Sequence, residues 1–127
     1  VSTSPGSILM IGIPFIQGEA RRMYDYLITL VTAPSEEQAR QIASALVERR
    51  LAACVNLAPV TSIFRWEGAV QDETEVLMII KTRAQVFEDM LATIKALHSY
   101  ELPEIIALPI VRGSNEYLKW IADETQD

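Results

Sequence analysis

Side chains suited to soft-metal or nucleophilic chemistry are scarce in this sequence, which contains one cysteine, Cys54, and one histidine, His98. Copper and zinc sites usually combine several thiolate and imidazole ligands. Because Cys54 has no second Cys or His near it, we favour a small buried residue over a metal ligand for this position. For His98 two interpretations stay open: a side chain that caps the end of a helix, or a ligand at the mouth of an intersubunit cleft.

Two charged residues, Glu75 and Lys81, lie on one face of a predicted strand. The default for each is a solvated or ion-paired side chain. Lys81, however, is near the end of a central strand, where partial burial requires a polar partner, and Glu104 is one candidate. Glu75, Lys81 and Glu104 are therefore candidate cleft or interface residues.

Aromatic residues form the second group of candidates, because large aromatic side chains are enriched in cores and at subunit interfaces. We expect Trp66 to pack in an interface, and Tyr100 and Trp120 to line a cleft.

No motif for a known catalytic chemistry is present: the sequence has no phosphate-binding glycine loop, paired-cysteine motif or histidine-rich tract. We predict a protein that is not an enzyme and requires no cofactor, with copper or zinc as candidate cations. The alternative is a small hydrolase of the acylphosphatase type, which shares the strand order derived below. That chemistry needs an Arg in an anion-binding loop, and the loop after the first strand, 32–35, contains none.

Composition narrows the range of partners. A net charge of −6 and a pI near 4.8 argue against nucleic acid, since both surfaces would be negative. The apolar run 8–16 is too short to span a bilayer, which takes roughly 20 residues. Cys54 has no partner for an internal disulfide, so we expect a cytoplasmic protein. Residues 1–22 are interpreted as an N-terminal extension or tag-like arm, and residues 23–127 as the single domain.

Hydrophobic periodicity predicts the elements that position these residues. Apolar runs at 26–31, 53–66, 70–82 and 104–111 indicate strands, and stripes at helical spacing indicate helices after Ser35, from Thr82 to about His98, and after Gly113. Ser35 with Gln38, and Thr82 with Gln85, match the capping box. Glu67-Gly68 separates the second and third strands and favours a tight hairpin.

The resulting order, βαββαβ plus a final helix, predicts an α+β ferredoxin-like sandwich. In this topology the second and fourth strands are at the edges, where proline is tolerated. Pro59 and Pro109 fall in those two strands, and the central strands contain none.

The second and third strands are each about twice the usual 5 to 6 residues. Their outer ends, near 61–66 and 70–75, should project beyond the subunit and expose Ile63, Phe64 and Trp66. A free two-stranded ribbon of this kind is marginal in water and prone to edge pairing. We therefore expect it to pair with a neighbouring subunit in a closed ring.

Several segments in order resemble the CutA family of divalent-cation-tolerance proteins, over about residues 24–121. They are Thr32–Pro34 (TAP), Arg50–Asn56 (RLAACVN), Ser62–Gly68 (SIFRWEG), Glu75–Thr82 (EVLMIIKT), His98–Ile105 (HSYELPEI), Gly113, Tyr117-Leu118 and Trp120. The resemblance implies a stable homotrimer with intersubunit strand pairing and a role in the response to copper and other divalent cations. It also links animal relatives to acetylcholinesterase anchoring, and it implies no established catalytic reaction.

The resemblance also points to two differences. Copper-binding members carry a Cys where this chain has Val31, and a second His where it has Leu97. Our sequence-based hypothesis is a homotrimeric module whose intersubunit clefts meet divalent cations or a small anion, with His98 and Cys54 as the candidate ligands.

Overall fold

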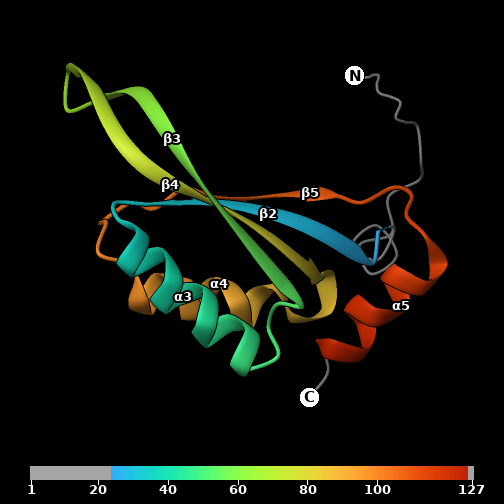
Figure 1. The fold of residues 1–127 in the computed structure, drawn as a ribbon. Coiled ribbons are helices and arrows are strands. Elements are labelled where there is room, and N and C mark those ends of the chain that lie inside the picture. Colours follow the sequence, from blue (N-terminus) through green and yellow to red (C-terminus); the bar gives the residue numbers. More distant parts are fainter. Residues whose placement is uncertain (1–23, 126–127) are drawn as a thin grey trace.

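The computed structural model describes residues 24–125, and its element labels are those of Figure 1. The predicted order βαββαβ with a final helix is confirmed for these residues. The elements are β2 (Tyr26–Ala33), α3 (Glu36–Glu48), β3 (Cys54–Trp66), β4 (Ala69–Arg83), a 3-10 turn (Ala84–Val86), α4 (Phe87–Leu97), β5 (Ile105–Pro109) and α5 (Asn115–Glu124). The expected extension, residues 1–22, lies outside the described part of the chain.

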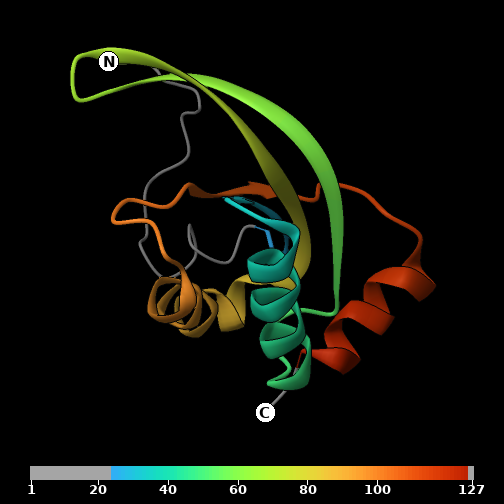
Figure 2. The same cartoon turned by 60° about the vertical axis from the view of Figure 1, so that its left-hand side comes forward.

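The four strands form one antiparallel sheet in the order β3-β4-β2-β5. The two helices α3 and α4 lie side by side against one face of this sheet (Figures 1 and 2). The prediction that the two proline-containing strands are edge strands is confirmed, because Pro59 lies in edge strand β3 and Pro109 ends edge strand β5. The fourth strand is shorter than the predicted range 104–111.

The side chains of the sheet alternate between a covered and an uncovered face. Toward α3 and α4 the sheet contributes fully buried residues, among them Val31, Met78 and Ile80, and these pack with Leu46 and Ile94 of the helices. This is the hydrophobic core of the subunit. Among the described residues, no helix is both long and apolar enough to cross a membrane.

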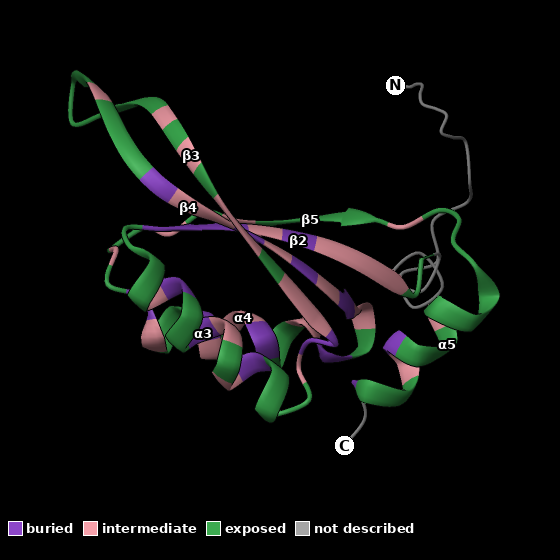
Figure 3. Cartoon of the chain, viewed as in Figure 1, coloured by how far each residue is buried: buried purple, intermediate pink, exposed green. Residues whose placement is uncertain are grey.

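We call the opposite side the helix-free face. By strand register it carries six large apolar residues: Ile28, Leu30, Leu77, Ile79, Ile106 and Leu108. The first four are partly buried, whereas Ile106 and Leu108 are 53% and 51% exposed. Figure 3 shows β5 as an exposed strand of the sheet. The apolar run in β2 therefore reflects a central strand, one face of which none of the helices between residues 24 and 125 covers.

The predicted projection of the hairpin is confirmed. Strands β3 and β4 are 13 and 15 residues long, but β2 pairs with β4 only as far as Ala33, opposite Val76. Beyond that point the two strands continue alone as a twisted ribbon, which we call the hairpin arm, residues 60–75 (Figure 1). At its tip, Glu67 and Gly68 have φ of 50° and 81°, as a two-residue type I′ turn requires.

The two predicted helix caps have different outcomes. Ser35 caps α3 as predicted, since its hydroxyl accepts the backbone N–H of Gln38 at 3.2 Å. The cap predicted at Thr82 with Gln85 is wrong. Thr82 is a buried residue of β4 whose hydroxyl donates to the Leu51 carbonyl oxygen at 2.7 Å, and α4 begins only at Phe87. The strand continues because this bond and the pairing with β2 hold Thr82 in extended backbone.

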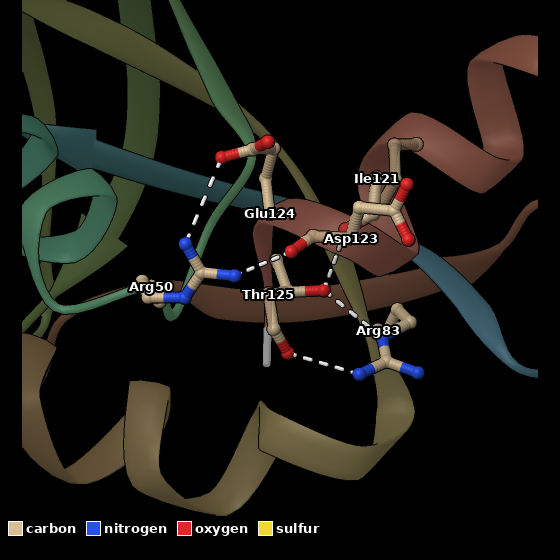
Figure 4. Close-up of polar contacts among 6 residues, drawn as sticks. All are labelled: Arg50, Arg83, Ile121, Asp123, Glu124 and Thr125. Atoms are coloured by element: carbon tan, nitrogen blue, oxygen red, sulfur yellow. Dashed lines mark hydrogen bonds and ion pairs between the residues drawn. The ribbon is translucent and has the colours of Figure 1, made fainter. Parts of the chain in front are cut away.

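Two arginines attach the C-terminal helix to the rest of the subunit (Figure 4). Arg83 donates from Nε to Thr125 Oγ1 at 2.9 Å and from Nη2 to the Thr125 carbonyl oxygen at 3.0 Å. The Thr125 hydroxyl in turn donates to the Ile121 carbonyl oxygen at 2.6 Å. Arg50 Nη2 donates to the carbonyl oxygen of Asp123. These contacts hold the C-terminal end of α5, and nearer its start Tyr117 lies against Cys54 at the start of β3.

Candidate functional site

The first cluster of polar residues lies where the hairpin arm leaves the sheet. Glu75 is the first residue of β4 beyond the β2 pairing and is only 5% exposed. Its carboxylate accepts a hydrogen bond of 2.6 Å from the Tyr100 hydroxyl. Burial, the hydrogen bond with Glu75 and the negative charges of Glu75 and Glu73 raise the pKa of Tyr100 to about 12. Tyr100 thus stays a neutral donor to this carboxylate at ordinary pH.

His98 holds the Tyr100 segment in place. Its ring is buried, with Nε2 at 2.7 Å from the carbonyl oxygen of Thr32, while Nδ1 accepts the backbone N–H of Tyr100 at 3.0 Å. Because a carbonyl only accepts, the ring carries its proton on Nε2. The imidazole and phenol rings are 4.8 Å apart. We call these four residues, Glu75, Tyr100, His98 and Thr32, the hairpin-base clamp.

This geometry bears on both interpretations of His98. The ring does not cap α4; only the backbone N–H of His98 closes that helix, on the Ile94 carbonyl oxygen. Both ring nitrogens are within hydrogen-bond distance of backbone groups of the same chain. A metal ion at His98 would have to displace one of these bonds.

The second cluster lies at the other end of the sheet, on the helix-free face. Lys81 of β4 is directly opposite Cys54 of β3, and its ammonium donates to the Asn56 side-chain oxygen. The Cys54 sulfur is 3.9 Å from the same oxygen. Tyr117 of α5 lies against Cys54, and burial first, then the electrostatic interaction and hydrogen bond with Cys54, raise the pKa of the Tyr117 phenol. We call this group, Lys81, Asn56, Cys54 and Tyr117, the Lys81 cluster.

The structure gives Lys81 a different partner from the expected one. Glu104 is exposed in the segment before β5, and Asn56 bonds the ammonium instead. Sequence analysis missed Asn56 and Tyr117. The alternation of Cys54 and Asn56 along a strand was a signal for the first, because residues i and i+2 share a face. No local signal linked Tyr117 to them, since it comes from α5.

The two candidate metal ligands are not brought together. Cys54 is level with Ile28 across the sheet, whereas His98 bonds at Thr32, four residues further along β2 and so about 13 Å away. Between residues 24 and 125 no group of three or more His, Cys, Asp or Glu side chains is arranged to hold a metal ion.

The remaining candidate residues are solvent-facing within one subunit. Trp66 ends β3 at the tip of the hairpin arm and is 39% exposed. Trp120 is also partly exposed and packs beside Tyr117 of the Lys81 cluster, with ring centroids 5.4 Å apart. An open groove elsewhere, between α3 and β3, is lined by none of the predicted site residues. Its lining is Ala43, Ser44, Val47, Glu48 and Val55.

The fold and these clusters define a ferredoxin-like α+β protein with an elongated hairpin arm and an appended C-terminal helix. A family match to "CutA1 divalent ion tolerance protein" spans residues 27–124. The chain belongs to this CutA1 family. The family description names a tolerance phenotype and no reaction, and the alternative of an acylphosphatase-like hydrolase receives no support from the comparisons.

Relatives extend across kingdoms. The chain is 52% identical over 99 residues to the divalent-cation tolerance protein CutA of Thermus thermophilus, covering 77% of this chain and 96% of that protein. It is 45% identical over 97 residues to human protein CutA, covering 76% of this chain and 54% of the longer human protein. Among solved structures, CutA from Archaeoglobus fulgidus matches with a TM-score of 0.78 at 46% identity, covering 80% of this chain and 99% of that one.

Proposed function

We propose that this protein acts as a homotrimer in divalent-cation tolerance, without catalysing a reaction, and that its intersubunit clefts bind a divalent cation or a small anion. The observation that carries the proposal is the apolar sheet surface that no helix in the described part of the chain covers. The helix-free face presents six large apolar residues in one sheet, two of them more than half exposed. An apolar surface of this kind on a small domain marks an interaction site.

The hairpin arm supports self-association independently. It carries Ile63, Phe64, Trp66 and Val70 as exposed large side chains, with exposures from 39% to 70%. Two strands alone are marginally stable in water. Edge strand β5 is short, and one of its sides is unpaired within the described chain. Pairing of one subunit's hairpin arm with the β5 edge of another subunit would give hydrogen-bond partners to the backbone groups of both edges. Repetition of this contact around an axis closes a ring.

The second part of the proposal is the identity of the cation and its ligands. Copper and zinc are the candidates because thiolate and imidazole are their usual ligands. The described residues of a single chain hold no ready group of three ligands. A cation site would therefore take ligands from more than one subunit, with Cys54 the more accessible candidate, because both nitrogens of His98 are occupied.

The proposed compartment is the cytoplasm, on the ground that Cys54 is a free thiol. The names of two relatives give other compartments: the protein of Arabidopsis thaliana is called chloroplastic, and that of Archaeoglobus fulgidus is called periplasmic. Expression with a fluorescent tag at the C-terminus, followed by fractionation, tests this part.

The test of the trimer is the solution mass. Multi-angle light scattering at low micromolar concentration should give three times the 14.2 kDa subunit mass. Replacing Ile106 and Leu108 by Glu should dissociate the trimer, whereas the same change at exposed Leu102, outside the strands, should not. A folded lone subunit in the unmodified protein would overturn the proposal. Calorimetry with copper, zinc and an anion panel tests ligand binding, and no heat with any of them would remove that part.

A further inference from the structure

Lys81 is a partly buried cation to which the described part of the chain offers no negative charge. Its only polar contact there is the neutral side-chain oxygen of Asn56. The three ion pairs found among the described residues all involve other cations, although the protein carries a net charge of −6. An ammonium has three donors, so at least two remain for another acceptor.

The Asn56 amide beside Lys81 offers a further donor. Because the oxygen of Asn56 accepts from Lys81, the NH₂ of this amide is left to donate. The Cys54 thiol donates to the same Asn56 oxygen, with sulfur and oxygen 3.9 Å apart, and the Tyr117 phenol is hydrogen-bonded to Cys54. Two groups with donors to spare, the ammonium of Lys81 on β4 and the amide of Asn56 on β3, thus lie side by side, with Cys54 and Tyr117 next to them.

The surroundings of this cluster are apolar. Ile28 is the cross-strand neighbour of Lys81 on β2, and Ile79 precedes it on the same face of β4. In the proposed trimer the helix-free face is covered, so the ammonium loses much of its water. A desolvated cation is costly unless an anion with matching hydrogen bonds compensates it.

We propose that the Lys81 cluster is a binding site for a small oxyanion, a carboxylate or a phosphate. Lys81 supplies the charge, its remaining N–H groups and the NH₂ of Asn56 bind the anion's oxygens, and Cys54 and Tyr117 lie beside them. Trp120, stacked beside Tyr117, borders the site on the α5 side. This inference rests on the proposed function, because covering of the helix-free face makes the site tight, and it names the ligand class and the residues of that cleft.

The experiment uses the full chain in an anion-poor buffer, with sodium phosphate and sodium succinate as separate probes. Binding is followed through the side-chain amide signals of Asn56 in ¹H–¹⁵N spectra and through the rate at which iodoacetamide, a neutral reagent, alkylates Cys54. Cys54 is the sole cysteine of the sequence, so alkylation reports on one position. We expect a saturable shift of the Asn56 amide and slower alkylation with at least one probe, and the better probe identifies the source of the oxyanion.

Two variants test the role of the charge. Lys81→Met should weaken binding by about tenfold or more, the loss expected for a hydrogen bond to a charged group. Asn56→Asp keeps an acceptor for Lys81 and adds a carboxylate that takes the place of the anion's negative charge. This variant should therefore not bind the anion, and its melting temperature without added anion should be higher than that of the unmodified protein. Lys95→Met is the matched control, because Lys95 is exposed on α4, and should leave the affinity within about twofold.

The outcomes separate this inference from the trimer proposal. A trimer that shows no saturable response to either probe overturns the anion site alone. The same holds if Lys81→Met binds as well as the unmodified chain, or if Asn56→Asp retains affinity. The acceptor on Lys81 could instead be a carboxylate of a neighbouring subunit. In that case the unmodified trimer would show no response to either probe, and the Lys81→Met trimer would dissociate. This result also refutes a free oxyanion. A monomer by light scattering refutes the proposed function instead.

Discussion

Removing one hydroxyl tests whether the hairpin-base clamp holds the arm. In Tyr100→Phe the Glu75 carboxylate, 5% exposed, loses the donor that lies 2.6 Å from it. Hydrogen bonds to charged groups contribute about 1.5–3 kcal/mol, and an unsatisfied buried group adds a desolvation cost. We expect a loss of about 2–3 kcal/mol in the free energy of unfolding per subunit. Glu75→Gln keeps an acceptor and should cost about 1 kcal/mol.

The assay is guanidinium denaturation followed by circular dichroism at one fixed protein concentration, since an oligomer's stability depends on concentration. Both single variants and the double variant give a coupling energy, which we expect at about 1–2 kcal/mol. Tyr24→Phe is the control, because Tyr24 is an exposed tyrosine and should change stability by less than about 0.5 kcal/mol. Coupling below about 0.5 kcal/mol, or equal effects at Tyr24 and Tyr100, would refute the reasoning.

The Tyr100–Glu75 pair also makes the free energy of unfolding depend on pH. The pKa of Tyr100 is raised from 10.0 to about 12, by burial first and then by Glu75 and Glu73. Between these values the unfolded chain has released a proton that the folded chain keeps. The stabilisation is therefore complete below pH 10 and is lost as the pH rises toward 12. The unfolding free energy of the unmodified protein should fall more steeply across this window than that of Tyr100→Phe.

Three further changes test other parts of the fold. Thr29→Val should stabilise the subunit by about 1 kcal/mol in thermal denaturation, because the buried Thr29 hydroxyl has no hydrogen-bond partner among the described residues; a destabilised variant would mean that the hydroxyl is satisfied. Arg83→Lys should lose the paired bonds to Thr125 and speed hydrogen exchange in α5 but not in α3, while equal rates would deny Arg83 this role. Gly68→Val should cost about 1–2 kcal/mol, since φ at Gly68 is +81°, and Gly68→Asn less; equal costs would exclude backbone strain as the cause.

Much of the fold was predictable because its signals are local. Ser35 caps α3 through a residue three positions away, and Glu67-Gly68 forms its turn through its own φ values. Pro59 and Pro109 marked the edge strands because proline lacks the donor a central strand needs. The prediction at Thr82 failed because the carbonyl of Leu51, 31 residues away, holds that hydroxyl. Tertiary context overrode a local capping signal there.

The sequence by itself determined the element order, the length of the hairpin arm and the family resemblance, because hydrophobic period, turn residues and motifs act over a few residues. It could name Cys54, Lys81, His98 and Tyr100 as candidates one by one. Only the tertiary structure decided their grouping, placing Cys54 and Lys81 with Asn56 and tying His98 and Tyr100 to backbone and Glu75. Contacts between β4 and segments 25 residues away depend on strand register and loop path, which no local pattern encodes.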